Sequence, residues 1–263
     1  MIDYKTNIFF KLTLLILFLV IDRNTNAQIS PTGVGDAQIA EWSALGIQQK
    51  LNSAKTWESM TYVGWANKSI RNYNPLDRKD SWVLNEAITH KMKVNNWRYA
   101  LSFIYKHKTK YSYTDDNINQ SVKQEFRTYG SVNYPFKLNY LTIVPTFRQE
   151  VRRFYTSDFD LPTEDLEFRT RFRLQFIFNL DKQNEHRIIG SSEQLFTFDH
   201  DHKNEDWSKY SYNESRFMLY YSYSPSTIPI QLDLGYKNDL LGTIHPHSAN
   251  YIAFDVIIKN PFF

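Results

Sequence analysis

The sequence predicts an all-β protein, a transmembrane antiparallel up-and-down β-barrel of about 12 strands with short periplasmic turns and longer extracellular loops. Three features point to this fold class: one long stretch of alternating character between Asp165 and Leu180, an export signal at the start, and connections that are alternately short and long. Because successive side chains of a strand point to opposite faces, such a chain suits lipid outside and a polar lumen inside.

The stretch from Asp165 to Leu180 separates into two faces. One face is aromatic and apolar (Leu166, Phe168, Thr170, Phe172, Leu174, Phe176, Phe178 and Leu180), and the other is mostly polar (Asp165, Glu167, Arg169, Arg171, Arg173, Gln175, Ile177 and Asn179). Strands of soluble sheets average about five or six residues, so this stretch is long for a soluble protein. A strand of this length, crossing an apolar slab at a tilt, suits a transmembrane β-barrel.

Residues 1–27 resemble an export signal. Lys5 and Lys11 precede the apolar run 12–21, and the small residues that end at Ala27 predict cleavage before Gln28. An N-terminal membrane anchor is the alternative, but the run is shorter than the ~20 apolar residues that a spanning helix needs. We therefore expect a signal peptide over residues 1–27, a single outer-membrane barrel over 28–263, and a multi-pass protein of the cell outer membrane.

The composition excludes several other classes of protein. A mean hydropathy of −0.52 excludes a bundle of apolar helices, whereas a barrel carries its membrane signal in alternation. The 18 Tyr and 19 Phe fit a lipid-facing surface with aromatic girdles. Without residues 1–27 the net charge is +2, which does not suggest nucleic acid as a partner. No cysteine is present, which excludes disulfides, a lipidated cysteine and thiolate metal sites.

Eleven strands are predicted along the chain, at 39–51, 57–70, 81–92, 97–108, 122–134, 140–153, 164–180, 186–198, 210–223, 230–237 and 250–259. Short connections at 52–55, 95–96, 135–139, 181–185 and 225–229 alternate with long polar ones at 71–80, 109–121, 154–163, 199–209 and 238–249. Outer-membrane barrels keep short turns on the periplasmic side and long loops outside. Five aromatic residues lie next to short turns and predict a periplasmic girdle: Trp57, Trp97, Tyr134, Tyr140 and Tyr223. The alternative is that large aromatic residues often start strands.

The strand count leaves one strand to be found. Both the strand that begins at Ile39 and the last strand should run toward the periplasm, and a barrel of this class has an even number of antiparallel strands. We therefore expect a twelfth strand in residues 28–34, although Pro31 and Gly33 are poor ladder residues. Ten strands are the fallback.

Spaced charged pairs in the chain resemble those of a known family. The residues concerned are Glu125-x-Arg127, Arg148-x-Glu150-x-Arg152, Asn213-Glu214-Ser215-Arg216, Gly235-Tyr236-Lys237-Asn238 and the closing stretch from Tyr251 to Phe263. They resemble the outer-membrane barrels of domain-of-unknown-function family 2490 over most of residues 39–263. The resemblance implies an exported outer-membrane barrel with no established activity, and it carries over no catalytic residues.

The last predicted strand has its own signal. Ile252, Phe254, Val256 and Ile258 alternate on one face, and the chain closes with Phe262 and Phe263. This pattern is similar to the terminal strand that barrel-assembly machinery recognises. The expected partners are thus the lipid bilayer and that machinery.

The polar face predicts an Arg/Glu network that lines the lumen. Its members are Glu125, Arg127, Arg148, Glu150, Arg152, Glu167, Arg169, Arg171, Arg173, Glu193, Glu214 and Arg216. If Arg152 lies opposite Glu167, the same register places Glu150 opposite Arg169, and across the next turn Arg173 faces Glu193. We favour a network that closes the lumen in a barrel with a structural or interaction role. The alternative is a narrow anion-preferring pore for a small acidic solute.

Other sites are weaker candidates. Residues 199–202 (Asp-His-Asp-His), with Glu205, Asp206, His245 and His247, contain possible metal ligands, but such residues in a polar loop are usually solvated. We expect no metal and no cofactor. Ser191, Ser192 and Ser248 share no strand face with a nearby His, so an outer-membrane hydrolase is a third alternative and we do not expect an enzyme.

Overall fold

The computed structural model describes residue 29 and residues 31–35, 37–69, 73–114, 117–242 and 246–262. The predicted signal peptide and its cleavage site before Gln28 lie outside these residues, as do His245 and Phe263. No helix in these described ranges is long and apolar enough to cross a membrane.

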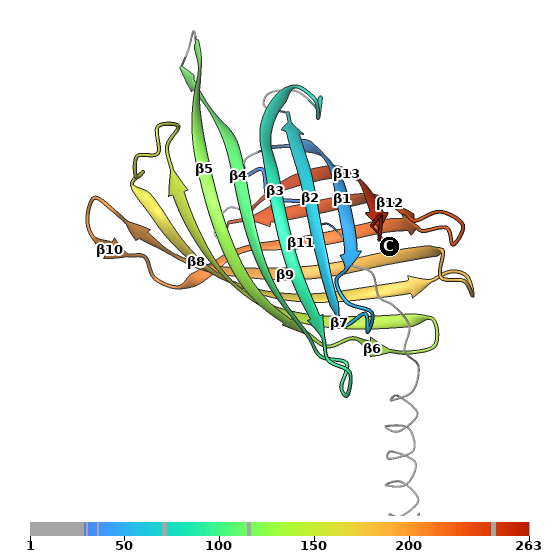
Figure 1. The fold of residues 1–263 in the computed structure, drawn as a ribbon. Helices are drawn as coiled ribbons and strands as arrows, with labels where there is room; N and C mark the ends of the chain where they lie inside the picture. Colours follow the sequence, from blue (N-terminus) through green and yellow to red (C-terminus); the bar gives the residue numbers. More distant parts are fainter. Residues whose placement is uncertain are drawn as a thin grey trace, which may run out of the picture.

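Eleven long strands of the described chain form a closed β-barrel (Figure 1). They are β1 (Ile39–Lys50), β2 (Trp57–Lys68), β3 (Arg78–Lys91), β4 (Arg98–Thr114), β5 (Asn117–Asn133), β7 (Leu141–Tyr155), β8 (Glu164–Asn179), β9 (His186–Asp201), β11 (Ser211–Tyr223), β12 (Ile230–Leu241) and β13 (His247–Lys259). Two short strands, β6 (Phe136–Lys137) and β10 (Asp206–Trp207), pair with β7 and β9 respectively.

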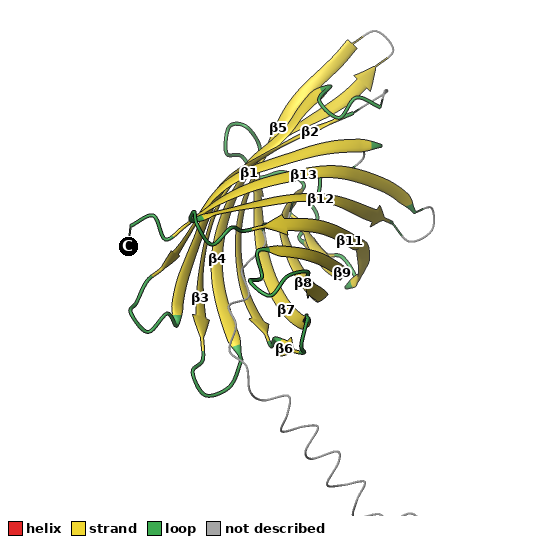
Figure 2. Ribbon diagram, turned by 90° about the vertical axis from the view of Figure 1, so that its right-hand side faces the viewer, coloured by secondary structure: helices red, strands yellow, loops and turns green. Residues whose placement is uncertain are grey.

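The barrel closes through a parallel pair. Every other neighbouring pair of long strands is antiparallel, but β1 and β13 run side by side in the same direction, with Ala44 opposite Asp255 (Figure 2). The prediction of twelve antiparallel strands, with ten as the fallback, is therefore wrong. The two end strands do run the same way, as expected, and direct pairing between them removes the need for another strand.

Residues 28–34 were expected to supply the twelfth strand, and the described part of this segment instead enters the lumen. Ile29 and Val34 are buried, and the backbone N–H of Val34 donates a hydrogen bond to the Tyr251 hydroxyl at 2.8 Å. Gly46 of β1 makes room for Ile29, because a Cβ at Gly46 would lie 3.1 Å from Ile29 Cδ1. Pro31 lacks the N–H that a sheet ladder requires, which favours this path.

The predicted strands are found within a few residues of their expected bounds, and the largest difference lies between β4 and β5. These strands continue as a hairpin to Thr114 and Asn117, so most of the predicted loop 109–121 is strand (Figure 1). The alternation that reveals a strand comes from one buried face. None of the side chains described in residues 109–121 is buried, so this sequence lacks that signal.

The two faces of the sheet differ as the alternation predicts. Along β8, Glu167, Arg169 and Arg171 are buried inside, whereas Phe172 and Phe178 are exposed outside. The outer surface carries large apolar side chains on strands around the barrel, among them Leu45, Val63, Leu101, Phe147, Leu219, Leu234 and Ile252. At the short-turn end Trp57, Trp97 and Tyr140 are exposed, and the Trp97 ring lies 5.1 Å from that of Tyr134.

Aromatic side chains fill part of the lumen. Trp42 lies over Gly64, where an added Cβ would come within 2.4 Å of its ring, and Tyr220 lies over Gly235 at the same distance. Trp42 Nε1 also donates a hydrogen bond to Asp255 Oδ1 at 2.9 Å, which ties β1 to β13. Glycine is required at these two positions because each ring occupies the space of a side chain.

Candidate functional site

The twelve charged residues expected in the lumen lie on five neighbouring strands and face inward. Glu125 and Arg127 are on β5, Arg148, Glu150 and Arg152 on β7, Glu167, Arg169, Arg171 and Arg173 on β8, Glu193 on β9, and Glu214 and Arg216 on β11. Within each strand they are two residues apart or multiples of two, which places them on one face.

The backbone register agrees with the sequence-based expectation. Arg152 lies opposite Glu167, Glu150 opposite Arg169, and Arg173 opposite Glu193. The side chains bond diagonally, however, since Glu150 is contacted by Arg171 and not by its direct neighbour Arg169. Long side chains reach diagonal partners across a sheet.

Glu150 is the centre of the network. Its oxygens lie 2.9 Å from Nε and Nη2 of Arg171, 3.6 Å from Nη1 of Arg127 and 3.5 Å from Nη1 of Arg148. The carboxylate is fully buried, at 0% exposure. One buried negative charge is thus shared by three guanidinium groups, and the hydrogen bond from Arg171 Nη2 is charge-assisted.

A second chain of contacts runs toward the long connections. Arg152 donates from Nε and Nη2 to Glu125 at 2.8 and 2.9 Å, and it also donates to Glu167. Glu167 accepts a further hydrogen bond from Arg169 Nε at 2.9 Å, and Arg169 Nη1 lies 3.5 Å from Glu214. These contacts join β5, β7, β8 and β11.

The network extends to residues that were not predicted to belong to it. Arg216 donates to Glu214 and has its Nε 3.7 Å from Asp239, and Asp239 accepts a hydrogen bond from Lys237 Nζ at 2.8 Å. Lys237 and Asp239 are both fully buried on β12. Their spacing of two repeats that of Glu125 and Arg127, so the alternation carried a signal for them.

Lysine side chains hold the N-terminal segment in the lumen. Lys106 Nζ donates to the carbonyl of Gly33 at 2.9 Å, Lys108 Nζ to that of Val34 at 2.7 Å, and Lys237 Nζ to that of Pro31 at 3.2 Å. Backbone carbonyls of the segment thereby serve as acceptors for three ammonium groups.

Inside the barrel, described residues line two small cavities of about 180 and 190 Å³. Both are lined by Thr32 of the N-terminal segment and by Arg127, Arg171 and Arg216. The segment and the network therefore lie between the two cavities and fill the middle of the lumen.

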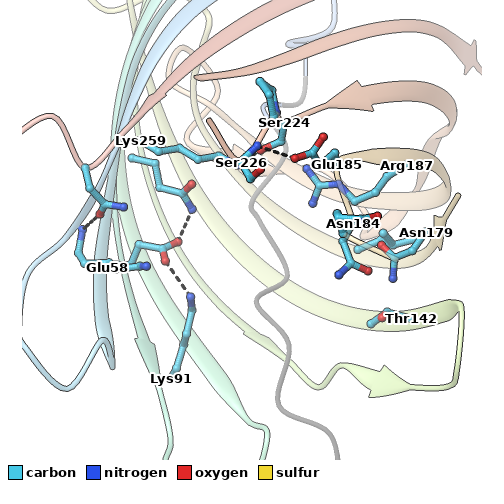
Figure 3. A pocket seen from close by; sticks show the side chains of 16 residues that line it. Glu58, Lys91, Thr142, Asn179, Asn184, Glu185, Arg187, Ser224, Ser226 and Lys259 are labelled. Atoms are coloured by element: carbon cyan, nitrogen blue, oxygen red, sulfur yellow. Dashed lines mark hydrogen bonds and ion pairs between the residues drawn. The ribbon is translucent and has the colours of Figure 1, made fainter. Parts of the chain in front are cut away.

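A larger cavity of about 660 Å³ lies at the short-turn end of the barrel, and we call it the vestibule (Figure 3). Its charged lining residues are Lys50, Glu58, Lys91, Glu185, Arg187 and Lys259. Glu58 accepts hydrogen bonds from Lys91 at 2.7 Å and from the Gln48 amide at 2.6 Å. None of these residues belongs to the predicted network.

The four cationic residues of the vestibule have equivalent positions in their strands. Lys50, Lys91, Arg187 and Lys259 each occupy an inward-facing position at the short-turn end of a strand. Glu185, in the turn before β9 and beside Arg187, accepts a hydrogen bond from the backbone N–H of Ser226 at 2.7 Å. Hydrogen bonding by Ser226 lowers the pKa of Glu185 below its ordinary value.

The other candidate sites do not assemble. His200 Nδ1 lies 2.7 Å from Asp165 Oδ1, and His202 Nδ1 lies 4.0 Å from Asp165 Oδ2. Within the described ranges, which leave out His245, no three His, Cys, Asp or Glu residues form a group that could hold a metal ion. Ser191 is buried on the inner face of β9, whereas Ser192 lies on its outer face.

Comparison with known proteins gives one finding. The model of a family described as "Protein of unknown function (DUF2490)" matches residues 40–249. No curated protein and no solved structure matches the chain.

Proposed function

Since the chain belongs to the DUF2490 family of proteins of unknown function, we propose that it is an integral outer-membrane β-barrel with a closed lumen. Its role is structural or in interactions with other molecules, and it is not an enzyme. The lipid bilayer and the barrel-assembly machinery are its expected partners, after export by a cleaved signal peptide.

The outer surface supports a membrane location. The long strands have 12 to 17 residues, more than the 9–11 or so that a tilted strand needs to cross the apolar core of a bilayer. The side chains that point outward include exposed Phe172, Leu219 and Ile252. A soluble protein rarely exposes apolar surface on all sides, because contact with water is unfavourable.

The observation that carries the closed lumen is the position of residues 31–35. Lys106, Lys108 and Lys237 hold this segment by its carbonyl groups, and Gly33 packs against Arg216, whose Nη2 is 3.1 Å from the position of a Cβ. The Glu150 network also contributes, because its ion pairs join β5, β7, β8 and β9. The segment and the network both line the cavities of about 180 and 190 Å³, and this supports a closed lumen.

A second candidate function is a narrow pore that prefers anions. The lining of the cavity of about 190 Å³ contains a single carboxylate, Glu214. Its cationic residues are Lys106, Lys108, Arg127, Arg152, Arg169, Arg171 and Arg216. Basic side chains around a narrow path select anions. This function requires residues 31–35 to leave the lumen.

Reconstitution into planar bilayers tests both candidates. The closed-lumen proposal expects no steady current from the native protein and a faster gel mobility before heating than after it. A variant that lacks residues 28–37 should conduct weakly and prefer anions if the segment is the plug, and Arg171→Glu in that variant should weaken the preference. A cation-selective current from the native protein would contradict both candidates. Folding of each variant is checked by its heat-dependent mobility.

A further inference from the structure

We propose that the vestibule is a binding site for a phosphate group, either as the free ion or as part of a phosphomonoester. The site lies at the short-turn end, away from the Glu150 network, and nothing in the proposed closed-lumen function requires it.

The charges of the vestibule leave an excess of cations. Four cationic side chains line it against two carboxylates, Glu58 and Glu185. Both carboxylates already have donors: Lys91 and the Gln48 amide contact Glu58, and the Ser226 N–H contacts Glu185. A mobile anion that enters the cavity would therefore meet positive potential that no side chain of the lining neutralises.

Arg187 is the side chain that most requires an anion. It is only 4% exposed, and its Nη2 donates to two neutral acceptors, Ser222 Oγ at 2.9 Å and Gln231 Oε1 at 3.2 Å. Its Nε has no hydrogen-bond partner among the described residues. Asp233 and Asp181 act on Arg187 electrostatically, but among the described residues neither lies close enough to form an ion pair with it. Burial of a guanidinium group with donors unused is costly, and a bound oxyanion would offset that cost.

Lys259 and Arg187 converge on the same strand end. Lys259 Nζ donates to Ser224 Oγ at 2.6 Å, and Ser224 follows two residues after the Ser222 that Arg187 contacts. Figure 3 shows Lys259 reaching from the side of Glu58 toward Ser224 and Ser226, with Arg187 beyond these serines. An arginine fork, an ammonium group and serine hydroxyls are the donors that proteins use for phosphate.

The size of the cavity extends the ligand class beyond the free ion. At about 660 Å³ it falls within the range of roughly 300 to 1,000 Å³ that small-molecule sites occupy. A phosphate group held by Arg187 and Lys259 would leave room for an attached organic group, which the amides of Asn179 and Asn184 could contact.

Titration calorimetry of the full-length mature protein in detergent, with inorganic phosphate at constant ionic strength, tests the site. We expect saturable binding, a loss of affinity of at least tenfold for Arg187→Gln, and a several-fold loss for Lys259→Gln. Lys182→Gln is the matched control, because Lys182 is an exposed cation in the turn next to the site and does not line it. The affinity of Lys182→Gln for phosphate should equal that of the native protein.

Three outcomes decide the question. Absence of saturable phosphate binding, or an equal loss in the Lys182 control, would overturn the proposal. If Arg187→Gln does not fold, Lys259→Gln decides alone. Binding to nanodiscs that contain phosphatidic acid, with Arg187-dependent affinity above that for inorganic phosphate, would support the site and identify a lipid headgroup as the source. These outcomes are independent of the bilayer currents that test the closed lumen.

Discussion

Nε and Nη2 of Arg171 each lie 2.9 Å from an oxygen of Glu150, and the Glu150 carboxylate has no exposure to solvent. Glu150→Ala would leave Arg127, Arg148 and Arg171 without their shared anion in the lumen. Removal of one partner of a buried ion pair costs about 3 to 5 kcal/mol. We expect a loss of this size in the free energy of unfolding by urea in detergent or lipid.

The control for this measurement is Asp158→Asn, an exposed loop carboxylate, which should change the free energy by less than about 0.5 kcal/mol. Equal effects of the two substitutions would show that Glu150 does not stabilise the barrel. The double variant Glu150→Leu, Arg171→Leu should recover part of the loss, since matched removal of a buried pair is often tolerated.

The proposal that the outer surface faces lipid predicts the effect of a charge at Phe172. This side chain is 51% exposed on the outer face of β8, with its ring 5.3 Å from that of Phe147. Phe172→Arg should destabilise the barrel by about 2 to 4 kcal/mol in a bilayer if the position is near the midplane. Phe159→Arg, in a long connection, should cost less when unfolding is measured in the same lipid. If Phe172→Arg has no effect in lipid, this face does not contact the apolar core of a membrane.

The rings above Gly64 and Gly235 predict a sharp difference between glycines. Gly64→Ala places a methyl group where the ring of Trp42 lies, and Gly235→Ala does the same to Tyr220. Overpacking typically costs about 1 to 3 kcal/mol, and loss of the Trp42–Asp255 hydrogen bond adds to it. Gly130→Ala and Gly190→Ala are matched controls, because a Cβ at either position meets nothing within 4 Å. Both control variants should have a higher Tm than both test variants. The reverse order would show that Trp42 and Tyr220 do not pack against these two glycines.

The N-terminal segment can be probed at Val34, because the chain contains no cysteine that would compete for a label. We expect Val34→Cys to resist a water-soluble maleimide, since Val34 is fully buried and its carbonyl accepts a hydrogen bond from Lys108. Adding Lys108→Met and Lys237→Met removes two of the contacts that hold the segment and should speed labelling at least tenfold. Fast labelling of the single variant would show that the segment does not occupy the lumen.

The turn at Glu185 should respond to pH. Because its hydrogen bond with Ser226 lowers the pKa in the folded state, this contact stabilises the turn above the ordinary pKa of a glutamate and is lost as the pH falls through the lowered value. Exchange of the Ser226 amide hydrogen, corrected for its intrinsic pH dependence, should accelerate in that window. Glu185→Gln should remove the dependence and Asp158→Asn should retain it.

Much of this barrel could be predicted from local patterns. Alternation gave the strands and their faces, and the spaced charges near Glu150 and Glu167 gave the register of β7 and β8. These features follow from the two-residue period of a strand and the short turns that join neighbours, both of which are local.

The closure of the barrel could not be predicted in this way. The alternating connections predict that β1 and β13 run the same way, but no turn joins these strands, so nothing in the nearby sequence marks their direct pairing. The path of residues 31–35 depends on Lys106 and Lys237, which come from distant strands. The vestibule likewise brings together the ends of many strands, and Arg187 becomes a candidate ligand only once Ser222 and Gln231 are known to surround it.

The parallel seam has a consequence for how the protein folds. Its partners, such as Ile39 and Asn250, are more than 200 residues apart, so the entropy of loop closure is largest for this pair of strands. We therefore expect the antiparallel hairpins to form first and the seam to close last. Until then β1 and β13 are open edges that can pair with other chains, and parallel hydrogen bonds are slightly weaker per residue. If the seam closes last, the Trp42–Asp255 hydrogen bond forms after the rate-limiting step of folding. It would then slow the opening of the barrel more than it speeds folding.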